Sequence, residues 1–216
     1  RVVRKGDTIT SIADEYAVSA ARILSDNGIL TPDGIAVGQA VVILFPDVTH
    51  IIRRGETLDY IARQYGVSAM SLLRNNPFLI GKPLPSGVEI AVSFRGEKYG
   101  SLHTNGYAYP NIDYKTLEYA LPFMSRLTIF GYGFTASGEL IYIPDAVLLD
   151  YARRYDVSPI MLLCTVTEDG TFSSAHADVM MSDVSARARL IDNVISVMTE
   201  KGYVGLDIDF EYINPD

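Results

Sequence analysis

The chain has 216 residues and a formal net charge of −8, with 48% hydrophobic and 20% charged residues. This composition is typical of folded globular domains, and the length allows one or two of them. The acidic balance argues against a nucleic acid or an anionic membrane as partner, because both are bound through basic patches. Cys164 is the only cysteine, so no intrachain disulfide is possible, and the three histidines show no metal-ligand spacing.

A sequence repeat occupies the first part of the chain. Arg4–Ala13 (RKGDTITSIA) matches Arg53–Ala62 (RRGETLDYIA), and the two copies stay in register beyond these segments. The spacing of apolar residues predicts a strand, two short helices and a closing strand in each copy. The closing strands are expected at 41–45 and 88–92, and the second helices are expected to begin at the N-caps Ser19 and Ser68.

The Gly-Asp-Thr and Gly-Glu-Thr turns, each followed by an Ile-Ala helix and a later Asn, resemble the LysM module. This resemblance implies α+β repeats of βααβ type at residues 1–46 and 49–94. It also implies that they bind N-acetylglucosamine polymers, either peptidoglycan or chitin. The sugar groove would be formed by Gly6, Asp7, Thr8, Ile9, Gly28, Ile29 and Leu30, and by Gly55, Glu56, Thr57, Leu58, Phe78, Leu79 and Ile80. Capping of a helix by Thr8 and core packing of Leu30 or Leu79 are alternative roles.

A short linker, residues 95–101, leads into a region where strand and helix patterns alternate. Such alternation predicts a parallel sheet with right-handed crossovers. The expected strands and helices, in chain order, are Gly106–Pro110, Tyr114–Leu121, Leu127–Phe134, Ala146–Tyr155, Ile160–Val166, Asp183–Lys201 and Val204–Ile213. The long helix should use an apolar face formed by Val184, Ala188, Ile191, Ile195 and Met198, with Gly202 as its C-cap.

Three acids alternate with large apolar residues in the last strand pattern, Gly205–Tyr212. Alternate side chains of a strand point to the same face, about 6.5 Å apart, so Asp207, Asp209 and Glu211 should form one carboxylate cluster. The solvated face of an edge strand would give the same alternation. The preceding helix favours a functional cluster over a solvated edge. A strand entered from a helix is typical of a parallel barrel, and functional groups of such barrels collect at the carboxyl ends of the strands.

The segment Val204–Glu211 (VGLDIDFE) resembles the fourth-strand signature of family 18 glycoside hydrolases, with Val204 where the family usually has an Asp. Asn105–Pro110 and Phe130–Phe134 resemble the first two strands of that family, whereas Cys164–Thr167 departs from its third. The resemblance implies an α/β fold, a partial (β/α)₈ TIM barrel over residues 102–216. Because the sequence starts at Arg1 and stops just after the acidic strand, we expect it to be an internal piece of a longer protein.

The family resemblance implies substrate-assisted retaining hydrolysis of a glycan that contains N-acetylglucosamine. Glu211 would be the general acid, Asp209 would orient the acetamido nucleophile of the substrate, and Asp207 would hold Asp209. The neighbouring carboxylates are expected to keep Glu211 protonated near neutral pH. Tyr107, Tyr109 and Tyr212 would bind substrate, or alternatively pack in the barrel. No metal and no cofactor is implied.

The order of two LysM-like repeats and this barrel resembles bacterial spore-cortex N-acetylglucosaminidases. A chitinase or a non-catalytic, lectin-like glycan-binding protein are the alternatives, and retention of Glu211 favours an enzyme. The expected location is extracytoplasmic, in the cell wall or spore envelope. No membrane partner is expected, because no apolar run reaches the length of a transmembrane helix.

Overall fold

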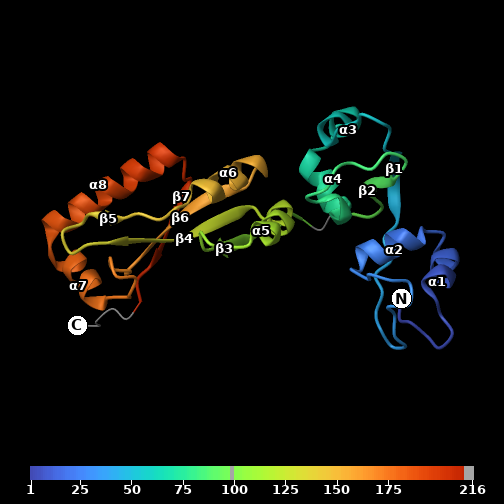
Figure 1. The fold of residues 1–216 in the computed structure, drawn as a ribbon, viewed down its shortest axis with the longest axis horizontal. Coiled ribbons are helices and arrows are strands. Elements are labelled where there is room, and N and C mark those ends of the chain that lie inside the picture. The colour runs from blue at the N-terminus through green and yellow to red at the C-terminus, as the bar shows by residue number, and fades with distance from the viewer. Residues whose placement is uncertain (98–99, 212–216) are drawn as a thin grey trace. The chain divides into compact units, whose positions relative to one another are not determined.

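The structure is a computed structural model that describes residues 1–97 and 100–211. The chain forms two compact units, Arg1–Ser101 and Leu102–Asp216 (Figure 1). The first unit contains both repeats and the second contains the alternating region. Tyr212, an expected substrate-binding residue, lies outside the described residues.

The first repeat is held by two short helices, α1 (Ile9–Tyr16) and α2 (Ala20–Asp26). The expected strand at 41–45 is wrong, because the structure has only an isolated bridge between Val2 and Ala40. Its backbone is nevertheless partly paired, since Val41 N donates to Arg1 O. The apolar helix face closes on the termini of the repeat in a small core of Val3, Ile9, Ile12, Ala13, Ile23 and Val41.

The second repeat has a regular antiparallel pair of strands. Its elements are β1 (Pro46–Ile51), α3 (Leu58–Tyr65), α4 (Ala69–Asn75), the 3₁₀ turn η1 (Pro77–Leu79) and β2 (Glu89–Phe94). The predicted cap Ser68 is confirmed, because its hydroxyl accepts a hydrogen bond from Ser71 N. Ser19 occupies the equivalent position before α2 without a side-chain capping bond.

The second unit is built on a parallel sheet with strand order β3-β4-β6-β7, as the alternation predicted. Its strands are β3 (Asn105–Ala108), β4 (Arg126–Phe134), β5 (Leu140–Ile141), β6 (Ser158–Cys164) and β7 (Gly205–Asp209). Its helices are α5 (Tyr114–Ala120), the 3₁₀ turn η2 (Leu121–Phe123), α6 (Ala146–Arg154), α7 (Ser174–Ser182) and α8 (Val184–Lys201). The sequence pattern missed α7 and the short strand β5, which pairs antiparallel with the end of β4.

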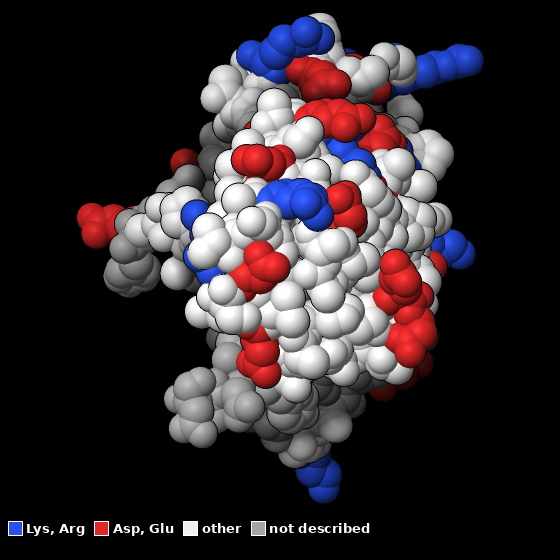
Figure 2. All heavy atoms as spheres, turned by 90° about the vertical axis from the view of Figure 1, so that its left-hand side faces the viewer, with Lys and Arg blue, Asp and Glu red and all other residues white. Residues whose placement is uncertain are grey.

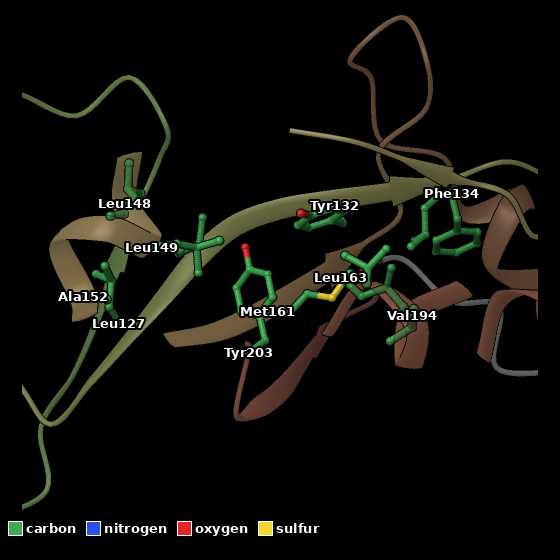
Figure 3. Packing of buried hydrophobic residues seen from close by; sticks show 14 of the residues in the cluster. Leu127, Tyr132, Phe134, Leu148, Leu149, Ala152, Met161, Leu163, Val194 and Tyr203 are labelled. Atoms are coloured by element: carbon green, nitrogen blue, oxygen red, sulfur yellow. The ribbon is translucent and has the colours of Figure 1, made fainter. Parts of the chain in front are cut away.

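One face of this sheet packs against helices and forms the main core (Figure 3). Leu127, Ile129, Met161 and Leu163 on the strands are buried against helix side chains such as Leu148 and Val194. About 25 cal/mol is gained for each Å² of apolar surface removed from water, so this face is the main source of stability of the unit. The opposite face carries the acids of β7.

Helix α8 buries a different stripe from the expected one. Its buried residues are Ala186, Leu190, Val194 and Val197, whereas Val184, Ile191 and Ile195 are 68%, 51% and 57% exposed. Both stripes have helical spacing, so periodicity alone could not choose between them. The buried side of α8 comes close to Gly138, because a Cβ at Gly138 would lie 2.3 Å from the backbone carbonyl oxygen of Ala186.

The glycines of the Phe130–Phe134 segment serve close packing between strands. A Cβ on Gly133 would lie 2.0 Å from the carbonyl oxygen of Val166, just beyond β6, so no larger residue fits there. The β4–β6 register is irregular between Ile129 and Tyr132, and the Phe130–Gly131 peptide bond within this stretch is cis. The contact between Gly133 and the backbone of Val166 therefore helps to shape the carboxyl end of β4.

Candidate functional site

Asp207 and Asp209 lie on the face of β7 that points away from the helices. In the β6–β7 register Asp207 pairs with Leu162 and Asp209 with Cys164, whereas Leu163, the partner of Ile208, belongs to the helix-covered core. Both aspartates are half-buried, and Glu211 follows the strand and is exposed. The structure thus brings the two aspartates to one face of a parallel strand, and Glu211 follows two residues after Asp209.

A tyrosine from the first strand of the sheet holds Asp207. The hydroxyl of Tyr107 donates a hydrogen bond to Asp207 Oδ2 at 2.8 Å, and this bond raises the pKa of Tyr107. Tyr107 is nevertheless 61% exposed, so it remains accessible to solvent. Sequence reasoning proposed Tyr107 as a sugar contact and missed its bond to the carboxylate, because the two residues are 100 positions apart.

Cys164 lies beside Asp209 on the neighbouring strand and is fully buried. Burial raises the pKa of its thiol, and the negative charge of Asp209 adds to this effect. The thiol donates a hydrogen bond to the carbonyl oxygen of Tyr132 at 3.4 Å. The cysteine is therefore a packed, protonated neighbour of the acids rather than a nucleophile.

Aromatic side chains extend the same edge of the sheet. Tyr109 is 57% exposed and packs against Phe130, with ring centroids 4.5 Å apart. An open hollow of about 440 Å³ lies toward the amino end of the sheet, lined by residues that include Asn105, Arg126 and Ser158. Asp207 is the only one of the three acids that lines it, so this hollow is not the place where all three could act on one substrate.

A buried polar cluster that the sequence did not reveal holds the segment between the end of α8 and the start of β7. Asp145, at the start of α6, accepts hydrogen bonds from the hydroxyls of Tyr132 and Tyr203 and from Lys201 Nζ at 2.8 Å. Burial opposes ionisation of Asp145, but these three donors lower its pKa below the usual value. Burial raises the pKa of Tyr132 to about 12, and the bond to Asp145 adds to this. Lys201 ends α8 and Tyr203 precedes β7, so the cluster fixes where the acidic strand begins.

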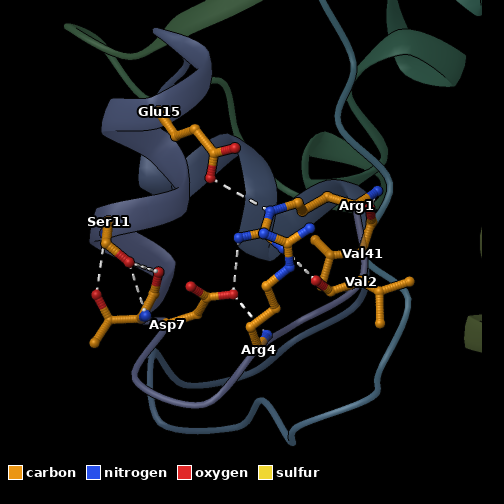
Figure 4. Close-up of polar contacts among 8 residues, drawn as sticks. Arg1, Val2, Arg4, Asp7, Ser11, Glu15 and Val41 are labelled. Atoms are coloured by element: carbon orange, nitrogen blue, oxygen red, sulfur yellow. Dashed lines mark hydrogen bonds and ion pairs between the residues drawn. The ribbon is translucent and has the colours of Figure 1, made fainter.

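In the first repeat, the turn acid Asp7 is fixed by its own surroundings (Figure 4). Asp7 Oδ2 accepts Arg4 N at 2.6 Å and the guanidinium of Arg1 at 3.0 Å. The hydroxyl of Thr8 caps α1 by accepting Ser11 N, which confirms the capping role considered for it. Gly6 adopts a φ of +93°, which side-chain-bearing residues rarely tolerate.

The second repeat repeats this arrangement with a histidine in place of the arginine. Glu56 Oε2 accepts Arg53 N at 2.7 Å and lies 2.8 Å from His50 Nε2. These contacts, first the backbone N–H of Arg53 and then His50, lower the pKa of Glu56. The hydroxyl of Thr57 caps α3, and Gly55 has a φ of +87°. Each turn therefore presents a rigid backbone loop rather than free side chains.

Burial divides the expected sugar-groove residues into two groups. Ile9, Leu79 and Ile80 are buried and serve the repeat cores, so their side chains are corrected to core residues. Leu30 is 96% exposed, and Ile29, Leu58 and Phe78 are half-buried. Gly28, Gly55, Gly6 and the two threonines are exposed. Only the half-buried and exposed residues offer surface to a ligand.

The comparisons with known proteins agree with this division of the chain. Residues 2–44 and 50–84 match the LysM domain family. The chain contains two LysM domains. The cortical fragment-lytic enzyme of Bacillus subtilis (strain 168) is 34% identical over 221 residues, covering 99% of this chain and 50% of the relative. The Bacillus anthracis enzyme of the same name is also 34% identical, over 223 residues, covering 99% and 51%.

The crystal structure of the Bacillus cereus spore cortex-lytic enzyme SleL superposes on the whole chain with a TM-score of 0.67 and 25% identity, and 51% of that chain is covered. The predicted resemblance to spore cortex-lytic enzymes is confirmed as homology, and so is the fold class, LysM repeats followed by an α/β partial barrel. The chain spans about half the length of the curated relatives it matches.

Three further observations bear on partners. Within the described ranges, no helix combines the length and the hydrophobicity needed to cross a bilayer. Among the same residues, no three His, Cys, Asp or Glu side chains converge in a way that could hold a metal ion. On the face shown in Figure 2, acidic and basic side chains are interspersed and form no continuous basic patch.

Proposed function

We propose that this chain belongs to a cell-wall glycoside hydrolase that cleaves N-acetylglucosamine-containing glycan, most specifically the peptidoglycan of the spore cortex. The observation that carries the proposal is the face of β7, where Asp207 and Asp209 point to the same side, Glu211 follows two residues later and Tyr107 is hydrogen-bonded to Asp207. The homology to cortical fragment-lytic enzymes supports it. We also propose that peptidoglycan is both its substrate and its binding partner, and that it acts outside the cytoplasm.

In the proposed mechanism the substrate supplies its own nucleophile. Glu211 donates its proton to the glycosidic oxygen as the bond to the anomeric carbon breaks, and the carbonyl oxygen of the 2-acetamido group attacks that carbon. Asp209 accepts the acetamido N–H and offsets the positive charge of the oxazolinium ring. Water then opens the ring, with Glu211 acting as base. Asp207, fixed by Tyr107, would hold Asp209 in place.

Tyr109 would line the sugar site, because its exposed ring lies on the same sheet edge. The two LysM domains would hold the enzyme on its polymer through the exposed turns at Gly6–Thr8 and Gly55–Thr57. Attachment to the polymer raises the local concentration of cleavable bonds without altering the chemistry.

The test of catalysis is Glu211→Gln in the natural protein that contains residues 1–216. The amide keeps the shape of the side chain but cannot donate a proton, so release of reducing ends from purified spore-cortex peptidoglycan should fall by about 10² to 10⁴. Asp209→Asn should also slow the reaction. Asp192→Asn, at an exposed position on α8, is the matched carboxylate control and should leave turnover unchanged.

Binding and cleavage are separated by measuring retention on insoluble peptidoglycan and on chitin in the same samples. Glu211→Gln should be retained like the parent. Near-parental turnover of Glu211→Gln would show that Glu211 is not the general acid. A parent protein that is retained on the glycan but releases no reducing ends would replace the enzymatic proposal with a lectin-like one, for which Val204 in the acidic motif is the supporting feature. Faster cleavage of chitin than of peptidoglycan would favour a chitinase.

A further inference from the structure

Arg22 of the first LysM domain makes direct contacts with the second. Arg22, on α2, donates from Nη1 to Asn76 Oδ1 at 2.9 Å and from Nη2 to the carbonyl oxygen of Asn75 at 2.6 Å. Its guanidinium also lies 4.9 Å from the centre of the Phe94 ring. Asn76 is fully buried, and its side-chain amide forms two hydrogen bonds with the backbone of Ala91 in β2. Arg22 is therefore hydrogen-bonded to a well-fixed part of the second domain.

A cleft of about 820 Å³ lies beside this contact, with walls from both domains. Ile29 and Leu30, in the loop after α2, form part of one wall, and Phe78 in η1 and Lys82 just beyond it form part of the other. Clefts of this volume are typical of sites for small ligands. Leu30 is 96% exposed, so its side chain is free to contact a ligand at the rim of the cleft.

The lining of the cleft suits a neutral ligand with apolar faces and polar edges. Ile29, Leu30 and Phe78 offer apolar surface, and Ser19, Ser25 and Thr49 offer hydroxyl groups. Arg22 is neutralised by Asp26, whose carboxylate lies 2.8 Å from its Nε. The remaining charges of the lining, Lys82 and Glu89, have opposite signs. A pyranose ring has the matching chemistry, with C–H faces and an edge of hydroxyl and acetamido groups, whereas a polyanion does not.

We propose that this cleft binds one continuous segment of an N-acetylated amino-sugar polymer, so that the second loops of the two LysM domains hold the same chain. The inference rests on the proposed binding of wall glycan, and it specifies the cleft between the two domains as the place where the polymer is bound. Because the Arg22 contact sets the spacing of the two walls, an oligosaccharide long enough to touch both gains contacts that a short one cannot. Affinity should therefore rise steeply with chain length.

The test is titration calorimetry of the 216-residue chain with chitin oligosaccharides of increasing length as probes. Leu30→Asp places a charge in the cleft at a position where the side chain has almost no folded-state contacts. It should weaken binding of the longest oligomers by about tenfold and affect the disaccharide much less. Val37→Asp, in the same domain at a 69% exposed position outside the lining, is the matched control and should bind as the parent does.

Amide NMR shifts on addition of the longest oligomer locate the site. The proposal expects changes at Ile29 and Leu30 and, across the cleft, at Phe78 and Val88. In Leu30→Asp the changes across the cleft should be lost. Parental affinity of Leu30→Asp, or shifts confined to the Gly6–Thr8 and Gly55–Thr57 turns, would overturn the cleft but leave wall binding intact. A folded parent chain that binds neither these oligomers nor insoluble peptidoglycan would overturn wall binding itself.

Discussion

Tyr107 and Asp207 are hydrogen-bonded at 2.8 Å although they lie on β3 and β7, the two ends of the strand order β3-β4-β6-β7. Two intervening strands separate them in the sheet, and neighbouring strands are about 4.8 Å apart. A flat sheet would hold these side chains much farther apart, so the bond requires a strongly curved sheet. Curvature of this kind is typical of a closing barrel, and it gathers the carboxylate-bearing face on its concave side.

Tyr107→Phe should lower the turnover of the natural protein by about tenfold, because Asp207 loses a charge-assisted hydrogen bond and its fixed orientation. Binding to insoluble glycan should stay unchanged. The measurement is kcat and KM on purified peptidoglycan across pH, since loss of positioning lowers kcat and changes the acid limb of the profile. Tyr119→Phe, on an exposed position of α5, is the control. Equal kcat for the parent and Tyr107→Phe would mean that Tyr107 only packs.

Asp145→Ala should lower the free energy of unfolding of the second unit by about 3 kcal/mol, because it leaves Lys201 and two buried hydroxyls without their acceptor. Asp150→Ala is the matched control, since Asp150 forms an exposed ion pair with Arg154 on the same helix. Exposed pairs of this kind contribute about 0.2 to 1 kcal/mol at most. Urea denaturation of both variants gives the comparison. Similar losses in the two would show that the buried cluster adds little.

The pKa of Glu56 is lowered, first by the backbone N–H of Arg53 and then by His50. A depressed carboxyl pKa stabilises the fold above the ordinary value of 4.5, and this contribution is lost as pH falls from there through the lower folded-state value. The second LysM domain should therefore lose stability below about pH 4.5. In Glu56→Gln that part of the acid dependence should disappear.

Glu89→Gln, at an exposed carboxylate of the same domain, serves as the control for this experiment and should keep the parental acid dependence. Thermal melts of the 216-residue chain between pH 3 and 7, followed by amide NMR signals of α3, report on the domain directly. Identical pH profiles for the parent and Glu56→Gln would contradict the assignment of the turn acid.

The exposed stripe of α8 should make the 216-residue chain self-associate. Ile191 and Ile195 are 51% and 57% exposed, and Leu206 and Ile208 of β7 are 40% and 59% exposed. Exposed apolar surface beside a strand edge favours association. Ile191→Lys with Ile195→Lys should shift sedimentation toward monomer, whereas Ser185→Lys with Ser196→Lys adds the same charge at exposed polar positions and should change it less. A parent that is monomeric at high concentration would contradict this prediction.

Local patterns in the sequence determined much of this protein. The repeat in register identified both LysM domains, the βα alternation predicted the parallel sheet, and the acidic strand was found from its two-residue period. Such features depend on residues close together in the chain, which a propensity or a period can encode. Gly202 as the C-cap of α8 is a further example, because a left-handed position at a helix end needs glycine locally.

Tertiary structure alone decided which of two apolar stripes on α8 is buried and whether Val41–Phe45 completes a strand. It also decided that Tyr107 holds Asp207, that Asp145 gathers Lys201 with two tyrosines, and that Ile9 belongs to a core rather than a groove. Each of these depends on contact between segments far apart in sequence. Residue period fixes which side chains share a face, but the free energy of burial depends on what lies opposite that face, and only the folded chain provides it.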